Sequence, residues 1–101
     1  MANLSTLGER IRMIREAENL NRKEMAELIG ASYGTLNNYE TKGVLVTETV
    51  LVKLTNHPRF EKYTLWLMTG KTNEAMGQIS PTLSPDGAEK EPSLRSERKI
   101  G

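Results

Sequence analysis

The sequence predicts an all-α fold, in which five short helices form one small domain and a disordered tail follows. Apolar residues recur at spacings of three and four in the first half of the chain, which is the period of helices with one buried face. Asn, Ser and Pro stand where helices would begin, and glycines stand where they would end. After about Gly70 the composition changes, because residues 81–101 contain no aromatic residue and hold three of the four prolines.

The first helix should run from about Thr6 to Asn19. One side of it is apolar and should face the core, whereas the other side is charged and should face solvent. The apolar residues are Leu7, Ile11, Ile14 and Ala17, and the charged ones are Glu9, Arg12, Glu16 and Glu18.

The second helix begins after Asn21, an N-cap residue, and Glu24 three positions later completes a capping box. Gly30 ends it, because the chain must adopt a positive φ after the last turn. Ser32 caps a third helix, which runs from Tyr33 to about Thr41.

A fourth helix should span about Glu48 to Asn56. Its valines and leucines also suit a strand, but the length of the segment and the lack of partner strands favour a helix. The fifth helix should start with Pro58 at its first position and stop at Gly70.

These segments divide the chain into a helical domain over residues 1–70 and an extended segment over residues 71–84. Residues 78–83 are compatible with a short strand that pairs across a dimer. Residues 85–101 have too few apolar side chains to offset the entropy of ordering, so we expect them to be disordered.

Composition excludes several classes of function. The 101-residue chain has no cysteine, so it holds no disulfide and no thiolate metal site. It shows neither a secretion signal nor a membrane span, so we expect a cytoplasmic protein. The net charge is only +1, and any affinity for DNA must therefore come from how the charges are arranged in space.

Residues 22–41 have the spacing of a helix-turn-helix, two short helices joined by a tight turn. Ala26 is small enough for a close helix crossing, and Gly30 four positions later permits the turn. The inward positions are apolar, namely Met25, Ile29, Ala31, Leu36 and Tyr39. An ordinary helical hairpin in a small bundle remains the alternative.

The third helix then presents polar and small residues outward. Asn37 and Asn38 can pair with adenine, Tyr33 can contact a thymine methyl group or a phosphate, and Gly34 permits close approach to a base. We therefore predict DNA base contacts by these four residues. Contacts to the DNA backbone should come from residues at or near the helix ends, namely Arg22, Ser32, Thr35 and Lys42. The alternative is that all these positions are merely solvated.

Several stretches of the sequence resemble a known family. The stretch "LGERIRMIREAENLNRKEMAELIGASYGTLNNYETKG" is similar to the lambda-repressor/Cro-type helix-turn-helix family. More closely, "SYGTLNNYE", "KYTLWLMTGK" and "GQISPTL" resemble the C immunity repressors of peduovirus-type temperate phages. The resemblance covers about residues 5–83.

The resemblance implies a five-helix lambda-repressor-like domain that binds double-stranded operator DNA as a homodimer and represses lytic promoters. It implies that Arg15 on the first helix pairs with Glu40 and also faces a DNA phosphate. It further implies operators built of direct repeats. Many family members have Gln where this chain has Arg22 and Tyr33, so no operator sequence is transferred.

Dimerisation is expected because one short helix contacts too few bases for selective binding. The fifth helix is more apolar than a single buried face requires, so part of it should meet a partner subunit. The residues expected at this interface are Phe60, Tyr63, Leu65, Trp66, Leu67 and Ile79. The alternative is that they all fill the core of one chain.

We expect neither catalysis, nor a cofactor, nor a metal. His57 precedes Pro58 and fits a helix start better than a ligand, and "MTGKTNE" lacks the first glycine of a phosphate-binding loop. Two rival functions stay open: a Cro-like or antitoxin-type regulator, and a helical protein-interaction module without DNA. An antirepressor protein is a further partner that such a repressor can have, although no residue identifies one.

Overall fold

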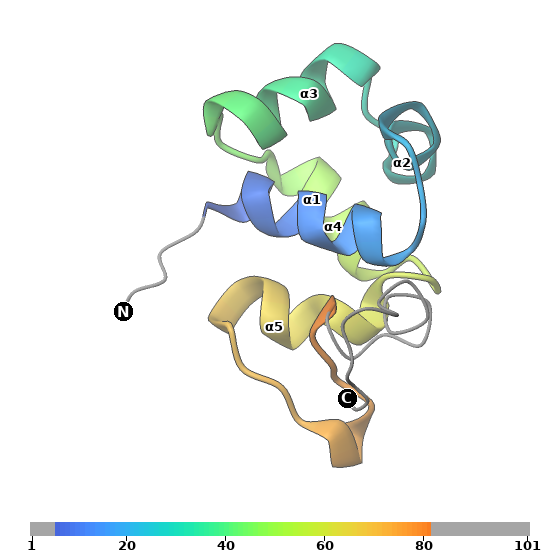
Figure 1. Ribbon diagram of the computed structural model, residues 1–101, viewed down its shortest axis with the longest axis vertical. Helices are drawn as coiled ribbons and strands as arrows, with labels where there is room; N and C mark the ends of the chain where they lie inside the picture. The colour runs from blue at the N-terminus through green and yellow to red at the C-terminus, as the bar shows by residue number, and fades with distance from the viewer. Residues whose placement is uncertain (1–5, 82–101) are drawn as a thin grey trace, which may run out of the picture.

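The computed structural model describes residues 6–81, and the all-α prediction is confirmed there (Figure 1). The helices are α1 (Leu7–Ala17), α2 (Arg22–Ile29), α3 (Tyr33–Lys42), α4 (Glu48–Thr55) and α5 (Thr64–Thr69). The described residues also form two short 3₁₀ helices, η1 (Glu61–Tyr63) before α5 and η2 (Glu74–Met76) after α5. The tail expected over residues 85–101 lies outside the described residues.

The helix starts are set by side-chain caps. Thr6 and Glu9 form a capping box on α1, and Asn21 and Glu24 form the predicted one on α2. The side chain of Ser32 accepts from the Thr35 amide and caps α3, as the sequence indicated.

Helix α1 lies in the middle of the molecule, with α2 and α3 on one side and α5 on the other (Figure 1). The core forms around its buried face, because Ile11 and Ile14 are completely inaccessible to solvent. The other core side chains come from every α-helix and from the segment around η1: Met25, Ala26, Ile29, Leu36, Tyr39, Val50, Leu54, Phe60, Tyr63 and Leu67. Burial of these apolar side chains supplies the main driving force for folding.

The predicted start of the fifth helix is wrong. Residues 58–60 form a turn, residues 61–63 form η1, and the α-helix begins only at Thr64. The cause lies 13 residues further on, where the amide of Gln78 inserts into the first turn. Its Oε1 accepts from the Leu65 amide at 2.9 Å, and its Nε2 donates to the Glu61 carbonyl at 3.1 Å. In an α-helix these two backbone groups would bond to each other.

The strand expected near residues 78–83 does not form within residues 78–81. There is one antiparallel bridge between Asn73 and Gln78, and the Ile79 amide donates to the Lys62 carbonyl at 2.9 Å. Residues 82 and 83 lie outside the described part of the chain. The segment after α5 therefore folds back as a loop whose Gln78 and Ile79 replace helical hydrogen bonds of η1 and α5.

Among residues 6–81, no helix is long and apolar enough to cross a membrane.

Candidate nucleic-acid interface

Helices α2 and α3 form a rigid pair around a tight turn. Ala26, at the crossing, is 3% exposed, and Gly30 adopts the left-handed conformation with a φ of 71°. The Ala31 amide donates to the Ala26 carbonyl at 2.9 Å and closes the turn. Met25 and Leu36 are fully buried between the helices and the rest of the core. This is the geometry of a helix-turn-helix, in which the second helix is presented outward.

The outward face of α3 carries the residues predicted to read bases. Tyr33 is 54% exposed, Gly34 is exposed, and Asn37 and Asn38 are half-buried. A Cβ placed on Gly34 would meet no atom within 4 Å, so packing within the chain does not require glycine at this position. The structure brings these four residues to one end and one face of a single helix.

A buried ion network lies under this face. The Arg15 guanidinium donates to the Glu40 carboxylate through two nitrogens, with Nε–Oε2 at 2.9 Å and Nη2–Oε1 at 3.1 Å. Arg22 donates from Nε to Glu40 Oε1 at 2.9 Å. The Glu40 side chain is completely buried, whereas those of Arg15 and Arg22 are 11% and 26% exposed. One carboxylate at the end of α3 therefore joins α1, α2 and α3.

The pairing of Arg15 with Glu40 that the resemblance implied is confirmed. Nη1 of Arg15 also donates to the Leu20 carbonyl at 2.9 Å, and the residue as a whole is 9% exposed. All three guanidinium nitrogens thus have acceptors within the chain. Arg15 therefore holds α1 against α3 through Glu40, and its contact with a DNA phosphate stays a prediction.

Arg22 also belongs to the ion network. Its hydrogen bond to Glu40, followed by one to the Tyr33 side chain, raises the pKa of Arg22 above its ordinary value. No local pattern indicated that this arginine at the start of α2 bonds to Glu40, 18 positions away.

The remaining backbone-contact candidates lie at the ends of α3. The Ser32 hydroxyl accepts from the Thr35 amide at 3.0 Å and donates to the Thr35 hydroxyl at 2.9 Å. Lys42 is exposed in the last turn of α3. Ser32, Thr35 and Lys42 thus flank the outward face of α3 at its two ends.

A second buried cluster of charged and polar side chains surrounds Glu18, and it was not predicted from the sequence. The residue was expected on the solvent-facing side of the first helix but is 3% exposed. Its carboxylate accepts from the Tyr63 hydroxyl at 2.7 Å, from Lys62 Nζ at 2.9 Å and from Arg59 at 3.3 Å. These partners follow it by more than 40 positions, so no local pattern could have indicated them.

The charge state of Glu18 follows from this environment. Burial of the carboxyl opposes ionisation, but the hydrogen bonds from Tyr63, Lys62 and Arg59 outweigh that effect. Together they hold the pKa of Glu18 below its ordinary value. The cluster joins the end of α1 to η1 and to Arg59 in the turn before it.

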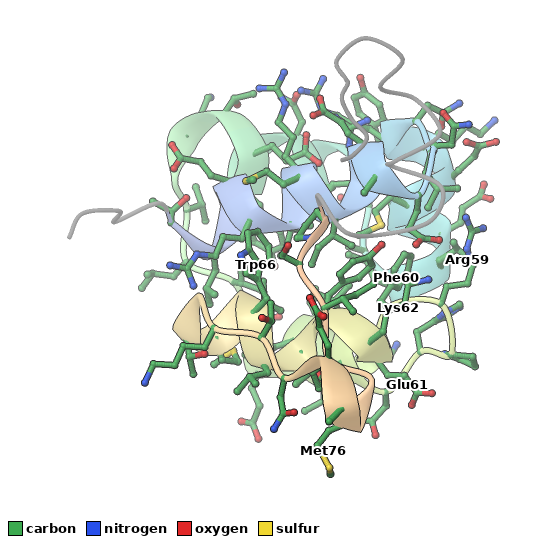
Figure 2. All side chains as sticks on the ribbon, turned by 60° about the horizontal axis from the view of Figure 1, so that its bottom comes forward. Arg59, Phe60, Glu61, Lys62, Trp66 and Met76 are labelled. Atoms are coloured by element: carbon green, nitrogen blue, oxygen red, sulfur yellow. The ribbon has the colours of Figure 1, made fainter. Side chains whose placement is uncertain are left out.

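The six residues expected at a dimer interface divide into two groups. Phe60, Tyr63 and Leu67 are each 1% exposed, so they fill the core of one chain and offer no surface to another. The partly buried residues are Leu65, Trp66 and Ile79. Arg10 lies over the Trp66 ring, 5.7 Å from its centroid, and Figure 2 shows Trp66 extending from α5 toward α1.

The fold and the exposed α3 face are those of a helix-turn-helix DNA-binding protein. The family model described as Helix-turn-helix matches residues 11–59, which include most of α1 and all of α2, α3 and α4. The chain belongs to this family. It is 37% identical over 97 residues to Repressor protein C of Escherichia phage P2, with 96% of this chain and 98% of that protein covered.

Proposed function

We propose that this chain is a transcriptional repressor of the prophage-immunity type, which binds promoter operators as a dimer and blocks lytic transcription. The observation that carries the proposal is the outward face of α3. This face carries Asn37, Asn38 and Gly34, a glycine that packing within the chain does not require. The helix itself is held in place by the buried ion network of Glu40, Arg15 and Arg22. The near full-length similarity to Repressor protein C of phage P2 supports repression as the outcome of binding.

Each part of the face has a role in this proposal. Asn37 and Asn38 contact base edges in the major groove, since an Asn amide pairs with the N6 and N7 atoms of adenine. Tyr33 contacts a base edge, for example the methyl group of a thymine, and Gly34 lets α3 approach the DNA closely. Phosphates are held by the groups that flank the helix, Ser32, Thr35 and Lys42.

A second copy of the chain would double the number of bases contacted. Leu65 and Trp66, both half-buried, belong to α5, which lies on one side of α1, whereas α3 lies on the other side (Figure 1). Ile79 is half-buried as well and donates its amide to the Lys62 carbonyl just before α5. A dimer formed through α5 would therefore leave both copies of α3 accessible to DNA. The same proposal places the protein in the cytoplasm of a bacterial host.

The test of DNA binding is selection of duplexes from a randomised library by the purified chain at two salt concentrations. Paired short motifs about one helical turn apart, or a multiple of it, are the expected result. The relative orientation of the motifs then decides between direct and inverted repeats. Weak binding without enrichment, abolished by moderate salt, would instead indicate nonspecific electrostatics and favour a protein-interaction module.

Asn38→Ala tests the assignment of the reading face. It should lower affinity for the selected site by about 1–3 kcal/mol and relax preference at one base pair. Thr49→Ala is the matched control, because Thr49 is exposed on α4, outside the proposed face. An equal loss on every duplex would make Asn38 a phosphate contact.

The dimer is tested by sedimentation at micromolar concentration. Leu65→Lys should shift the chain toward the monomer, since it places a charge in the proposed interface. Val52→Lys is the control, because Val52 is a 52% exposed aliphatic residue on α4. A wild-type chain that sediments as a monomer, both alone and on operator DNA, would contradict the dimer.

A further inference from the structure

Arg10 is a half-buried residue of α1 whose guanidinium reaches the last turn of α5. Its Nη1 donates to the Leu67 carbonyl at 2.9 Å and to the Trp66 carbonyl at 3.3 Å. The guanidinium carbon also lies 5.7 Å from the centroid of the Trp66 ring, within the range of a cation–π contact. A cation of α1 therefore holds the carboxyl end of α5, where the carbonyl groups carry partial negative charge.

Helix α5 depends on such contacts for its position. It is only six residues long, and isolated helices of fewer than about 12 residues are marginal in water. The Gln78 side chain holds its first turn, Leu67 is buried in the core, and Arg10 holds its last turn. The bonds from Arg10 tie the carboxyl end of α5 directly to α1.

Helix α1 is fixed to α3 on its other side. The Arg15 guanidinium bonds through two nitrogens to the buried Glu40 carboxylate at the end of α3. Helix α1 thus lies between the two helices to which the proposed function gives different roles, base reading for α3 and dimerisation for α5 (Figure 1). In a dimer formed through α5, the orientation of α5 on α1 determines how far apart the two copies of α3 lie.

We propose that Arg10 is a positioning residue, which fixes the dimer interface on α5 relative to α3 and thereby sets the distance between the two DNA half-sites. The inference rests on the proposed function, because it requires base reading by α3 and a dimer formed through α5. Half-site spacing follows from how a dimer holds its two reading helices. Loss of Arg10 should therefore change the preferred spacing and leave the sequence of each half-site unchanged.

Two variants of Arg10 and one control suit this test. Arg10→Met removes the charge and the hydrogen bonds but keeps a long side chain beside Trp66. Arg10→Lys is the milder change, because an ammonium group can still approach the same carbonyls, and it keeps the test available if Arg10→Met unfolds. Arg12→Met is the matched control, since Arg12 lies on the same helix with a side chain that is 51% exposed.

The first readout uses duplexes that carry two selected half-sites, with spacings that increase one base pair at a time. The wild-type chain should bind one spacing best. Arg10→Met should reduce by about tenfold the ratio between affinity at that spacing and affinity one base pair away, a factor typical of a lost bond to a charged group. Arg10→Lys should reduce the ratio less, and Arg12→Met should leave it unchanged.

A readout on the free protein comes from fluorescence, because Trp66 is the only tryptophan of the sequence. Arg10→Met should change the emission of Trp66, since the guanidinium no longer lies over its ring, whereas Arg12→Met should not. Sedimentation and thermal unfolding of each variant establish whether it is dimeric and folded at the temperature of measurement.

The outcomes separate this inference from the proposed function. If the wild-type chain enriches no motif, or is monomeric on operator DNA, the proposed function fails and the inference fails with it. If the wild type behaves as proposed, an equal loss of affinity at every spacing for a folded Arg10 variant overturns the inference alone. Dissociation of the Arg10→Lys dimer also overturns it, because Arg10 would then be needed to form the interface. A flattened spacing preference with an unchanged half-site sequence and an altered Trp66 emission supports it.

Discussion

The backbone of α1 touches that of α3 at Gly8, where an added Cβ would lie 1.8 Å from the carbonyl oxygen of Tyr39. No side-chain atom fits at that distance, and the obstructing atom belongs to a helix backbone that cannot rotate away. The position of α3 against α1 therefore depends partly on the absence of a side chain at residue 8.

Gly8→Ala should destabilise the protein by about 1–3 kcal/mol or more, because α1 and α3 must move apart to admit the methyl group. The better helix propensity of alanine offsets only a part of this, about 1 kcal/mol at most. Urea unfolding followed by far-UV circular dichroism measures the change. A variant as stable as the wild type would show that the two helices do not approach so closely.

Gly34→Ala is the complementary substitution on the exposed face of α3. A Cβ there meets nothing within 4 Å, so the free protein should gain stability by about 0.4–1 kcal/mol through a less flexible unfolded chain. Binding to the selected operator should weaken at the same time, because the methyl group would stand between the helix and DNA. A stabilised variant with unchanged affinity would remove Gly34 from the interface.

The features of the fold that were predicted correctly depend on residues close together in the sequence. The capping box of Asn21 and Glu24, the turn at Gly30 and the cap at Ser32 are confirmed, because each depends on residues within a few positions. The membership of the family was also readable from motifs spread over residues 5–83. Local chemistry therefore predicted α2, α3 and the face that α3 exposes.

Two of the errors were caused by partners far away in the sequence. The start of α5 was misplaced because the Gln78 amide occupies its first turn, and Glu18 was expected in solvent because Tyr63 and Lys62 lie more than 40 positions later. Periodicity shows which residues of a helix share a face. It does not show which distant segment will satisfy a charge on that face.

Glu18 should give the protein a specific dependence of stability on acid. Because its folded-state pKa is lowered, the carboxylate stabilises the fold fully above the unfolded pKa of about 4.3. That contribution is lost as the pH falls through the lower pKa of the folded state. Glu18→Gln should therefore be less stable than wild type at pH 7 by about 1–3 kcal/mol.

The measurement is the free energy of unfolding of both proteins between pH 7 and pH 2. The difference between them should shrink as the pH falls below about 4.3, since a protonated carboxyl and an amide are both neutral. Glu27→Gln is the control, because Glu27 is exposed on α2. A difference that stays constant over the whole range would assign the effect of Glu18 to packing.

Glu40→Gln should be the most damaging change of a single carboxylate in this fold. It leaves the guanidinium of Arg15, whose side chain is 11% exposed, without its buried counter-ion, and it turns an amide N–H₂ toward another donor. Breaking a buried ion pair from one side typically costs about 3–5 kcal/mol. Because Glu40 also holds Arg22, DNA selectivity should fall even where the variant remains folded.

Glu16→Gln is the matched comparison, since Glu16 pairs with Arg12 at 3.1 Å, lies 3.9 Å from Arg15 Nη2 and has a side chain that is 51% exposed. An exposed pair of this kind contributes less than about 1 kcal/mol. The two variants differ in burial and in connection to α3, although each removes one carboxylate that is bonded to an arginine of α1. Equal unfolding free energies for the two would mean that the network under α3 is no stronger than a surface ion pair, and α3 would then owe its position to apolar packing alone.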